Sequence, residues 1–340
     1  MHKYIDLMNL EERIHAFSQL GDFLKKTSDL EFTQKLKEAE IRNHWFTLEN
    51  QKEALKVWAN KLTIETLEAW LTPYDLKEQD DPKNVLVIMA GNIPLVGFND
   101  FISVLITGNN VIVKMSSDDN ILLAFIAKKL IAICPEFKER VQFIEEIKNK
   151  KLDAVIATGS DVSAKYFNYY FRDAKKIIRK NRNSVSILDG TESKTELELL
   201  GKDVFSYFGL GCRNVSKVFL PKGYDLDQLF EAFYSFRDII EHKKYANNYD
   251  YHKAMFLMGD YQIIDNGFFL LKEDKSLQSP LAMLYYEYYS TKEEVENFIA
   301  ENKDKLQCVV SKSHIAFGET QNPNLWDYAD AKDTIEFLVN

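Results

Sequence analysis

One short run of residues, 85–90 (VLVIMA), restricts the fold of this chain more than any other feature. A run that is wholly apolar, this short and ended by Gly91-Asn92 is typical of a β-strand buried on both faces. A helical stretch follows at 98–107, and similar apolar runs recur at 111–114, 141–144 and 152–157. Strands that alternate with helices predict βαβ units and a parallel sheet.

Polar segments follow these strands, at the edge where parallel sheets bind their ligands. They are Gly91-Asn92, residues 114–117, Thr158-Gly159-Ser160 and the stretch after Leu188. Asp118 or Asp119 is predicted to cap a long helix that runs to Ala132.

The rest of the chain predicts a helical beginning and a second α/β set. Residues 5–70 carry Leu and Phe at helical spacing. From about Thr195 the pattern predicts helices up to Phe208 and at 225–238, 243–255 and 291–304, with strands at 215–221, 267–271, 281–289 and 306–310. A length of 340 residues suits two domains of ordinary size.

Composition excludes several classes of protein and site. The net charge of −9 argues against a nucleic-acid binder, which needs a basic surface. Three scattered cysteines, without a CxxC pair, predict neither a disulfide framework nor a cysteine zinc site, and without HExxH no metal site is expected. The sequence shows neither a signal peptide nor an apolar run near the roughly 18 residues of a spanning helix, so we expect a cytoplasmic protein without membrane insertion.

The segment 209–214 (GLGCRN) carries the most reactive side chain of these motifs. A cysteine in a turn between a helix and a strand can be exposed, with backbone N–H groups nearby for an oxyanion. Arg213 is expected to lower the pKa of the Cys212 thiol. A buried structural cysteine is the commoner fate of a cytosolic cysteine, and both interpretations stand on the residues alone.

Each of the other motifs also has two interpretations. Asn92 either donates to an oxyanion or belongs to a simple turn. Lys114 either binds a cofactor ribose or phosphate or is a solvated lysine at a strand end. Thr158-Gly159-Ser160 opens a helix, and either cradles a pyrophosphate or provides an ordinary serine N-cap.

Together and in this order, these segments resemble the acyl-CoA reductase branch of the aldehyde dehydrogenase superfamily, which includes the fatty-acid reductase subunit of bacterial bioluminescence. The resemblance covers roughly residues 80–340, and is most specific at 182–190 (RNSVSILDG), 208–214 (FGLGCRN) and 321–330 (QNPNLWDYAD). It implies an aldehyde-dehydrogenase-like α/β fold, with a Rossmann-type cofactor domain and a second α/β catalytic domain. We assign them to residues 1–190 and 191–315, with 316–340 as a tail returning to the first domain or to a subunit contact.

The resemblance also implies roles for individual residues. Cys212 is the nucleophile and Asn92 holds the oxyanion. The cofactor residues are Lys114, Ser116 and Ser117 at the adenosine ribose, and Thr158, Gly159 and Ser160 at the pyrophosphate.

Three departures from the superfamily refine these expectations. Residues 177–182 lack the general-base glutamate that hydrolysis of a thioester needs. Ser117 replaces a glutamate that disfavours a 2'-phosphate, so NADPH is expected, with NADH as the alternative. The glutamate that grips the nicotinamide ribose is not evident near Ser279-Pro280.

The expected function is NADPH-dependent reduction of a fatty acyl thioester, from acyl-CoA or an acyl carrier, to an aldehyde through an acyl-cysteine. The alternatives are an aldehyde-oxidising NAD(P)-dependent dehydrogenase and a non-catalytic acyl-binding relative. The expected partners are further copies of the chain, and an acyl-transferase or synthetase that delivers the acyl group.

Overall fold

The computed structural model describes residues 8–26, 28–76, 81–147 and 151–340 of the chain. The chain forms two compact units, which are Met1–Lys180 together with Asn324–Asn340, and Asn181–Pro323. The first boundary lies before β6 (Asn183–Ile187) because this strand pairs with β7 (Val215–Pro221) and β11 (Leu306–Val310) of the second unit. The sequence had placed the boundaries at 190 and 315.

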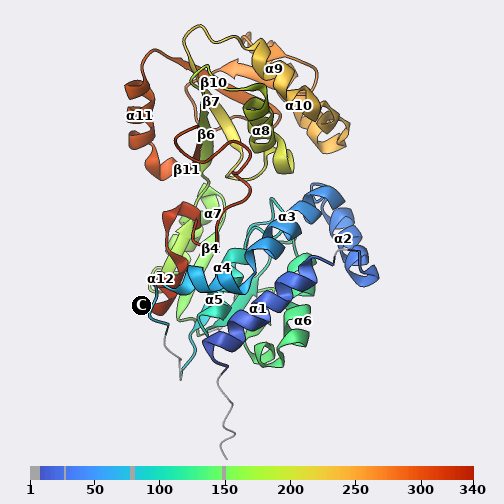
Figure 1. Ribbon diagram of the computed structural model, residues 1–340, viewed down its shortest axis with the longest axis vertical. Helices are drawn as coiled ribbons and strands as arrows, with labels where there is room; N and C mark the ends of the chain where they lie inside the picture. The colour runs from blue at the N-terminus through green and yellow to red at the C-terminus, as the bar shows by residue number, and fades with distance from the viewer. Residues whose placement is uncertain (1–7, 27, 77–80, 148–150) are drawn as a thin grey trace, which may run out of the picture. The chain divides into compact units, whose positions relative to one another are not determined.

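The first unit, which contains α1 to α7 and α12 in Figure 1, is built on a five-stranded parallel sheet with the order β3-β2-β1-β4-β5. Its strands are β1 (Asn84–Ile88), β2 (Asn110–Lys114), β3 (Val141–Phe143), β4 (Ala154–Thr158) and β5 (Lys175–Arg179). The parallel sheet was predicted, whereas β5 was not. The stretch after Leu188 was expected at this sheet and belongs to the other one, because β6 pairs there.

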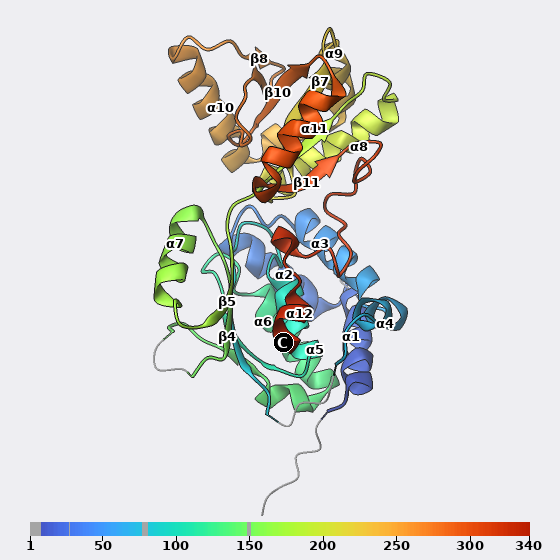
Figure 2. The same cartoon turned by 90° about the vertical axis from the view of Figure 1, so that its left-hand side faces the viewer.

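Both faces of the first sheet are covered, as its apolar strands require. On one face, residues such as Val87, Val113 and Ile156 form a core with helices from both ends of the chain. The opposite face, with Leu86 and Val155, packs against α7 (Asp161–Tyr170) (Figure 2). The helices of the larger core are α1 (Leu10–Leu24), α2 (Leu30–Arg42), α3 (Leu48–Lys61), α4 (Ile64–Leu71), α5 (Phe98–Ile106), α6 (Leu122–Ile133) and α12 (Thr334–Val339).

Most of these helices begin at the side chains that helix N-termini favour. Asn9 forms a capping box with Glu12 at the start of α1. The predicted cap of α6 was wrong: the helix begins after Ile121, which makes no side-chain cap hydrogen bond. The Asp119 carboxylate accepts the backbone N–H of Leu95, so this aspartate serves a different part of the fold.

The C-terminal segment returns to the first unit and is fixed there by polar contacts that are buried or partly buried. Tyr328 accepts a 2.7 Å hydrogen bond from the indole of Trp70. Tyr74 donates to Asp333 at 2.6 Å, and Arg179 donates to Thr334 at 2.9 Å.

The second unit contains a six-stranded sheet with the order β11-β6-β7-β10-β9-β8. Its pairs are parallel except β8 with β9. One face packs on α8 (Lys194–Phe205) and α9 (Asp227–Phe233), and the other packs on α11 (Lys292–Glu301). The remaining elements are α10 (Lys243–Met258), β8 (Ile264–Asp265), β9 (Leu270–Glu273) and β10 (Met283–Tyr289).

Candidate active site

The carboxyl edge of the first sheet gathers all the candidate residues except Cys212. Asn92 follows β1, Lys114 ends β2 and Thr158 ends β4. Since β1 pairs with both β2 and β4, these three strand ends are neighbours. Asn92, Ser117 and Ser160 are exposed at this edge, whereas Lys114, Ser116, Thr158 and Gly159 are half-buried.

A close backbone approach joins the loops after β1 and β2. A side chain added at Gly91 would place its Cβ 2.5 Å from the Ser116 hydroxyl. Glycine is therefore required at 91 for the two loops to touch. The Met89 N–H also donates to the Lys114 carbonyl at 3.1 Å, extending the parallel ladder toward these loops.

The turn after β4 has the structure of an ordinary helix start. The Ser160 hydroxyl accepts the Ser163 N–H at 3.2 Å and is the N-cap of α7. A Cβ on Gly159 would lie 2.9 Å from that of Ser163, so the glycine lets the turn pack on the helix. A ten-residue helix with its N-terminus at this edge presents N–H groups and a positive dipole end.

Cys212 lies in the second unit and is exposed, which excludes the buried structural cysteine as its description. Helix α8 ends at Phe205, three residues before the predicted end at Phe208. The following 3₁₀ turn, Ser206–Gly209, has left-handed backbone at Tyr207 (φ 51°), Phe208 (φ 60°) and Gly209 (φ 78°). Such a run of left-handed residues is uncommon outside glycine and marks a segment whose surroundings over-determine its shape.

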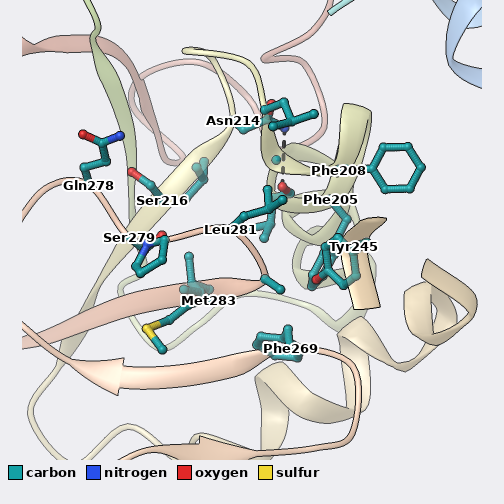
Figure 3. Close-up of a pocket in the computed structure, with 17 residues that line it drawn as sticks. Phe205, Phe208, Asn214, Ser216, Tyr245, Phe269, Gln278, Ser279, Leu281 and Met283 are labelled. Atoms are coloured by element: carbon teal, nitrogen blue, oxygen red, sulfur yellow. Dashed lines mark hydrogen bonds between the residues drawn. The ribbon is translucent and has the colours of Figure 1, made fainter. Parts of the chain in front are cut away.

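The side chain of Asn214 makes several of the hydrogen bonds that hold this segment in place. Its amide donates to the carbonyls of Asp203, Val204 and Ser206, at 3.0, 3.4 and 2.8 Å. Its oxygen accepts the Gly211 N–H at 2.8 Å. One buried amide thus ties the end of α8 to the turn that carries Cys212 (Figure 3). The sequence motif contains Asn214, but nothing in its spacing revealed this role.

Two further contacts fix the surroundings of the cysteine turn. Ser184 of β6 donates to the Cys212 carbonyl at 2.9 Å. The buried Asp203 carboxylate accepts the Gly318 and Thr320 N–H groups at 2.7 and 3.1 Å, which holds the returning chain against α8.

Arg213 has contacts that the sequence did not anticipate. Its guanidinium donates to the thiol of Cys308, at 3.3 Å, and to the Thr320 carbonyl, at 3.4 Å. These contacts connect it with β11 and the chain beyond, so a role in packing accompanies any effect on Cys212.

A cavity of about 280 Å³ lies beside the cysteine turn, within the second unit. Leu210 and Asn214, on either side of Cys212, both contribute to its wall. Much of the remaining lining is apolar, with Phe205, Phe269 and Met283 among the side chains drawn in Figure 3. Tyr245 also lines it, and within the described residues its buried hydroxyl has no hydrogen-bond partner.

The segment 177–182 lacks carboxylates in sequence, but the fold brings one to it. Asp100 of α5 forms a buried ion pair with Arg179, the last residue of β5. The two side chains are only 4% and 6% exposed. This carboxylate is committed to a structural pair, which makes it a poor base for activating water.

A further buried carboxylate, Asp119, lies at the edge that carries Asn92 and Lys114. Burial raises its pKa to about 7, and the hydrogen bond from the Leu95 N–H opposes that shift. Sequence reasoning treated Asp119 only as a helix cap. Its position just after the polar loop of a buried strand was the one available signal of another role.

Comparison with known proteins identifies the family. Residues 24–232 match the family described as acyl-CoA reductase (LuxC). This chain belongs to the LuxC family. Within 235 aligned residues it is 26% identical to a long-chain acyl-protein thioester reductase of Aliivibrio fischeri. The match covers 63% of this chain and 48% of that protein, so the LuxC-family chain described here spans about half the length of this relative.

Solved structures that resemble this fold include aldehyde dehydrogenases. The indole-3-acetaldehyde dehydrogenase AldA of P. syringae, in complex with NAD+ and IAA, is 12% identical, with a TM-score of 0.65 over 89% of this chain and 72% of that one. Aldehyde dehydrogenase 21 of Physcomitrella patens, with succinate, is 11% identical, with a TM-score of 0.71 over 97% and 84%. The LuxC-family chain therefore has the aldehyde-dehydrogenase-like α/β fold that its sequence predicted.

The part of the chain that the structure describes contains no group of three or more His, Cys, Asp or Glu side chains placed to hold a metal ion. None of its helices has both the length and the apolar character needed to cross a bilayer.

Proposed function

We propose that this protein reduces a fatty acyl thioester to an aldehyde, with NADPH as the hydride donor and an acyl-cysteine at Cys212. The observation that carries the proposal is the exposed Cys212 thiol of a LuxC-family chain, which lies three residues after a left-handed segment, in a turn that the Asn214 side chain braces. An exposed cysteine at a rigid turn is the arrangement expected of a nucleophile.

In the proposed reaction, the Cys212 thiolate attacks the thioester carbonyl. Asn92 donates a hydrogen bond to the oxygen as it becomes negative. The C–S bond to the original thiol then breaks, that thiol leaves, and the acyl group remains on Cys212. The nicotinamide cofactor, when bound, would supply the hydride that reduces this acyl group, and the C–S bond to Cys212 breaks as the aldehyde leaves, which restores the thiolate.

The carboxyl edge of the first sheet suits that cofactor. The half-buried Lys114 provides a positive charge, and the N-terminus of α7 at Ser160 provides N–H donors for a pyrophosphate. Ser116 and Ser117 add hydroxyls beside Lys114, while Thr158 and Gly159 form the turn before α7. Because Ser117 is not a carboxylate, its side chain does not repel a 2'-phosphate, which favours NADPH over NADH.

The state of the nearby carboxylates supports a reductase over an aldehyde-oxidising, hydrolysing enzyme. Hydrolysis of the acyl-enzyme needs a base that activates water. Asp100, the carboxylate beside residues 177–182, is buried and paired with Arg179. The acyl group should therefore persist on Cys212 until hydride or a thiol arrives.

The size of the cavity beside the turn that carries Cys212 supports an aliphatic acyl group as part of the substrate. Its volume of about 280 Å³ is nearly twice the ~150 Å³ of an apolar protein cavity that binds benzene. Replacing Leu281, in its wall, with Phe should shift the preferred acyl length downward in a series of acyl-CoA substrates. An unchanged length profile would place the acyl chain elsewhere.

The decisive experiment separates acylation from reduction. Acyl-CoA without cofactor should leave one acyl group on Cys212, visible by intact mass, and NADPH should then release aldehyde. Cys212→Ser should abolish both steps while NADPH still binds, whereas Cys134→Ser is the matched control and should behave as wild type. Rapid release of fatty acid without cofactor would indicate a hydrolysing enzyme, and substantial activity in Cys212→Ser would contradict the nucleophile.

A further inference from the structure

We infer that Asp119 is a positioning residue, which holds the loop carrying Asn92 in the shape that oxyanion binding needs. The inference rests on the proposed function, because it gives Asp119 its effect through Asn92. All the contacts that support it lie within the first unit.

The loop after β1 contains one residue that cannot hold its conformation unaided. Leu95 has left-handed backbone, with φ of 58°, which is costly for a residue with a side chain. Its side chain is buried, so its N–H also needs a protein partner. The Asp119 carboxylate accepts that N–H at 3.1 Å. Asp119 thus stabilises the unfavourable residue three positions after Asn92.

The loop that carries Asp119 is itself fixed. The Asp119 N–H donates to the Ser116 carbonyl at 3.3 Å, and the Asp118 N–H donates to the Ser116 hydroxyl at 3.2 Å. Ser116 in turn contacts Gly91 so closely that any side chain there would collide with it. The Asn92 loop is therefore held at Gly91, just before the asparagine, and at Leu95, just after it.

The carboxylate has no comparable second task in the described part of the structure. Its side chain is buried, and its Oδ1 finds no hydrogen-bond partner there. Burying a carboxylate costs free energy, so we infer that Asp119 is retained for the effect of its one hydrogen bond, from the Leu95 N–H. Asparagine has the same shape and one acceptor oxygen, so it can keep the Leu95 bond, whereas alanine cannot.

The test compares Asp119→Ala and Asp119→Asn with a matched control. In Asp153→Ala, a carboxylate that accepts the Asn84 N–H at the opposite end of β1 is lost. We expect Asp119→Ala to slow acylation of Cys212 by about 100-fold, the cost of a misplaced catalytic group. Affinity for NADPH should stay near wild type, and amide exchange in residues 91–97 should become faster. Asp119→Asn should restore most of the acylation rate, and Asp153→Ala should change none of these measurements.

Asn92→Ala separates failure of this inference from failure of the proposed function. If Asn92→Ala is slow and Asp119→Ala acylates at the wild-type rate, the positioning role is wrong and the proposed function stands. Equal losses in Asp119→Asn and Asp119→Ala would also contradict positioning, because the bond to Leu95 would not be what matters. If the wild-type protein does not acylate Cys212, the proposed function itself is wrong.

Discussion

At the scale of single residues, the candidate site depends on side chains with very different surroundings. Cys212 and Ser117 are exposed and can be tested by their chemistry. Asp119 and Asn214 are buried and act through the backbone groups they bind. Substitutions at the two kinds of position should therefore differ in whether stability changes along with activity.

Ser117→Glu should change cofactor preference and leave the fold intact. A carboxylate close to a 2'-phosphate adds repulsion of about 1 kcal/mol at 4 Å in water, and more near a protein surface. NADPH should bind at least about fivefold more weakly, while NADH binding changes little. Titrating both cofactors by fluorescence measures this change in affinity. Ser160→Ala is the control, because it should weaken the binding of NADPH and NADH equally. Tighter NADH binding in wild type, unaltered by Ser117→Glu, would contradict the predicted pocket.

Asp119 should also make stability depend on pH. Its pKa is about 7 in the folded protein and about 3.9 in an unfolded chain. Between these values the folded state holds one more proton, so stability falls as pH rises from about 4 to 7 and then levels off. The difference in unfolding free energy between wild type and Asp119→Asn should therefore change across this range, by up to about 4 kcal/mol. Urea unfolding at pH 4.5 and 8 measures it, and a constant difference would show an ordinary pKa.

At the scale of elements, the sequence predicted those parts of the fold that follow from local pattern. The apolar runs at β1, β2 and β4 identified buried parallel strands, and the polar ends of those strands identified one edge. It did not predict β5, because this strand begins with the charged residues Lys175-Lys176 and only its second half is buried. The early end of α8 was also missed, because the left-handed turn depends on Asn214 bonds to residues as far as 11 positions away. Such bonds leave no periodic trace in a sequence.

Asn214→Ala should loosen the join between α8 and the cysteine turn. It leaves the buried Gly211 N–H without its acceptor, which costs about 1–3 kcal/mol. We expect a loss of that size in the free energy of unfolding of the second unit, with slower acylation of Cys212. In the matched control, Asn248→Ala, a half-buried side chain on α10 loses its solvent-exposed hydrogen bond to the Lys244 carbonyl, and the change should be within about 0.5 kcal/mol. Equal effects of the two substitutions would contradict the bracing role.

At the scale of the whole molecule, the first unit is assembled from two separated parts of the chain. Residues 324–340 complete it after the chain has passed through the second unit. Their attachment includes Arg179, which forms an ion pair with Asp100 and donates to Thr334 of α12. This network connects the last strand of the sheet with the last helix of the chain.

Arg179→Met should therefore destabilise the first unit strongly. Removing one partner of a buried ion pair leaves an uncompensated charge, at a cost of about 3–5 kcal/mol. The double variant Arg179→Met/Asp100→Leu should recover most of that loss, because both charges are then gone. As the control, Arg172→Met removes an exposed pair with Asp173 and should cost less than about 1 kcal/mol. Calorimetry of the wild type and these three variants measures the losses in stability. A double variant no more stable than Arg179→Met would contradict the prediction.

The returning segment also has a consequence for how the protein is made. A ribosome synthesises the chain starting at its N-terminus, and domains generally fold in the order in which they emerge from the ribosome. The second unit, which is continuous, can form as soon as Pro323 has left the exit tunnel. The first unit must wait, because Trp70 and Arg179 lack their partners Tyr328 and Thr334 until residues 324–340 have also been synthesised. The unit whose synthesis begins first is thus completed after the second one, and a premature stop within codons 324–340 would harm the first unit more than the second.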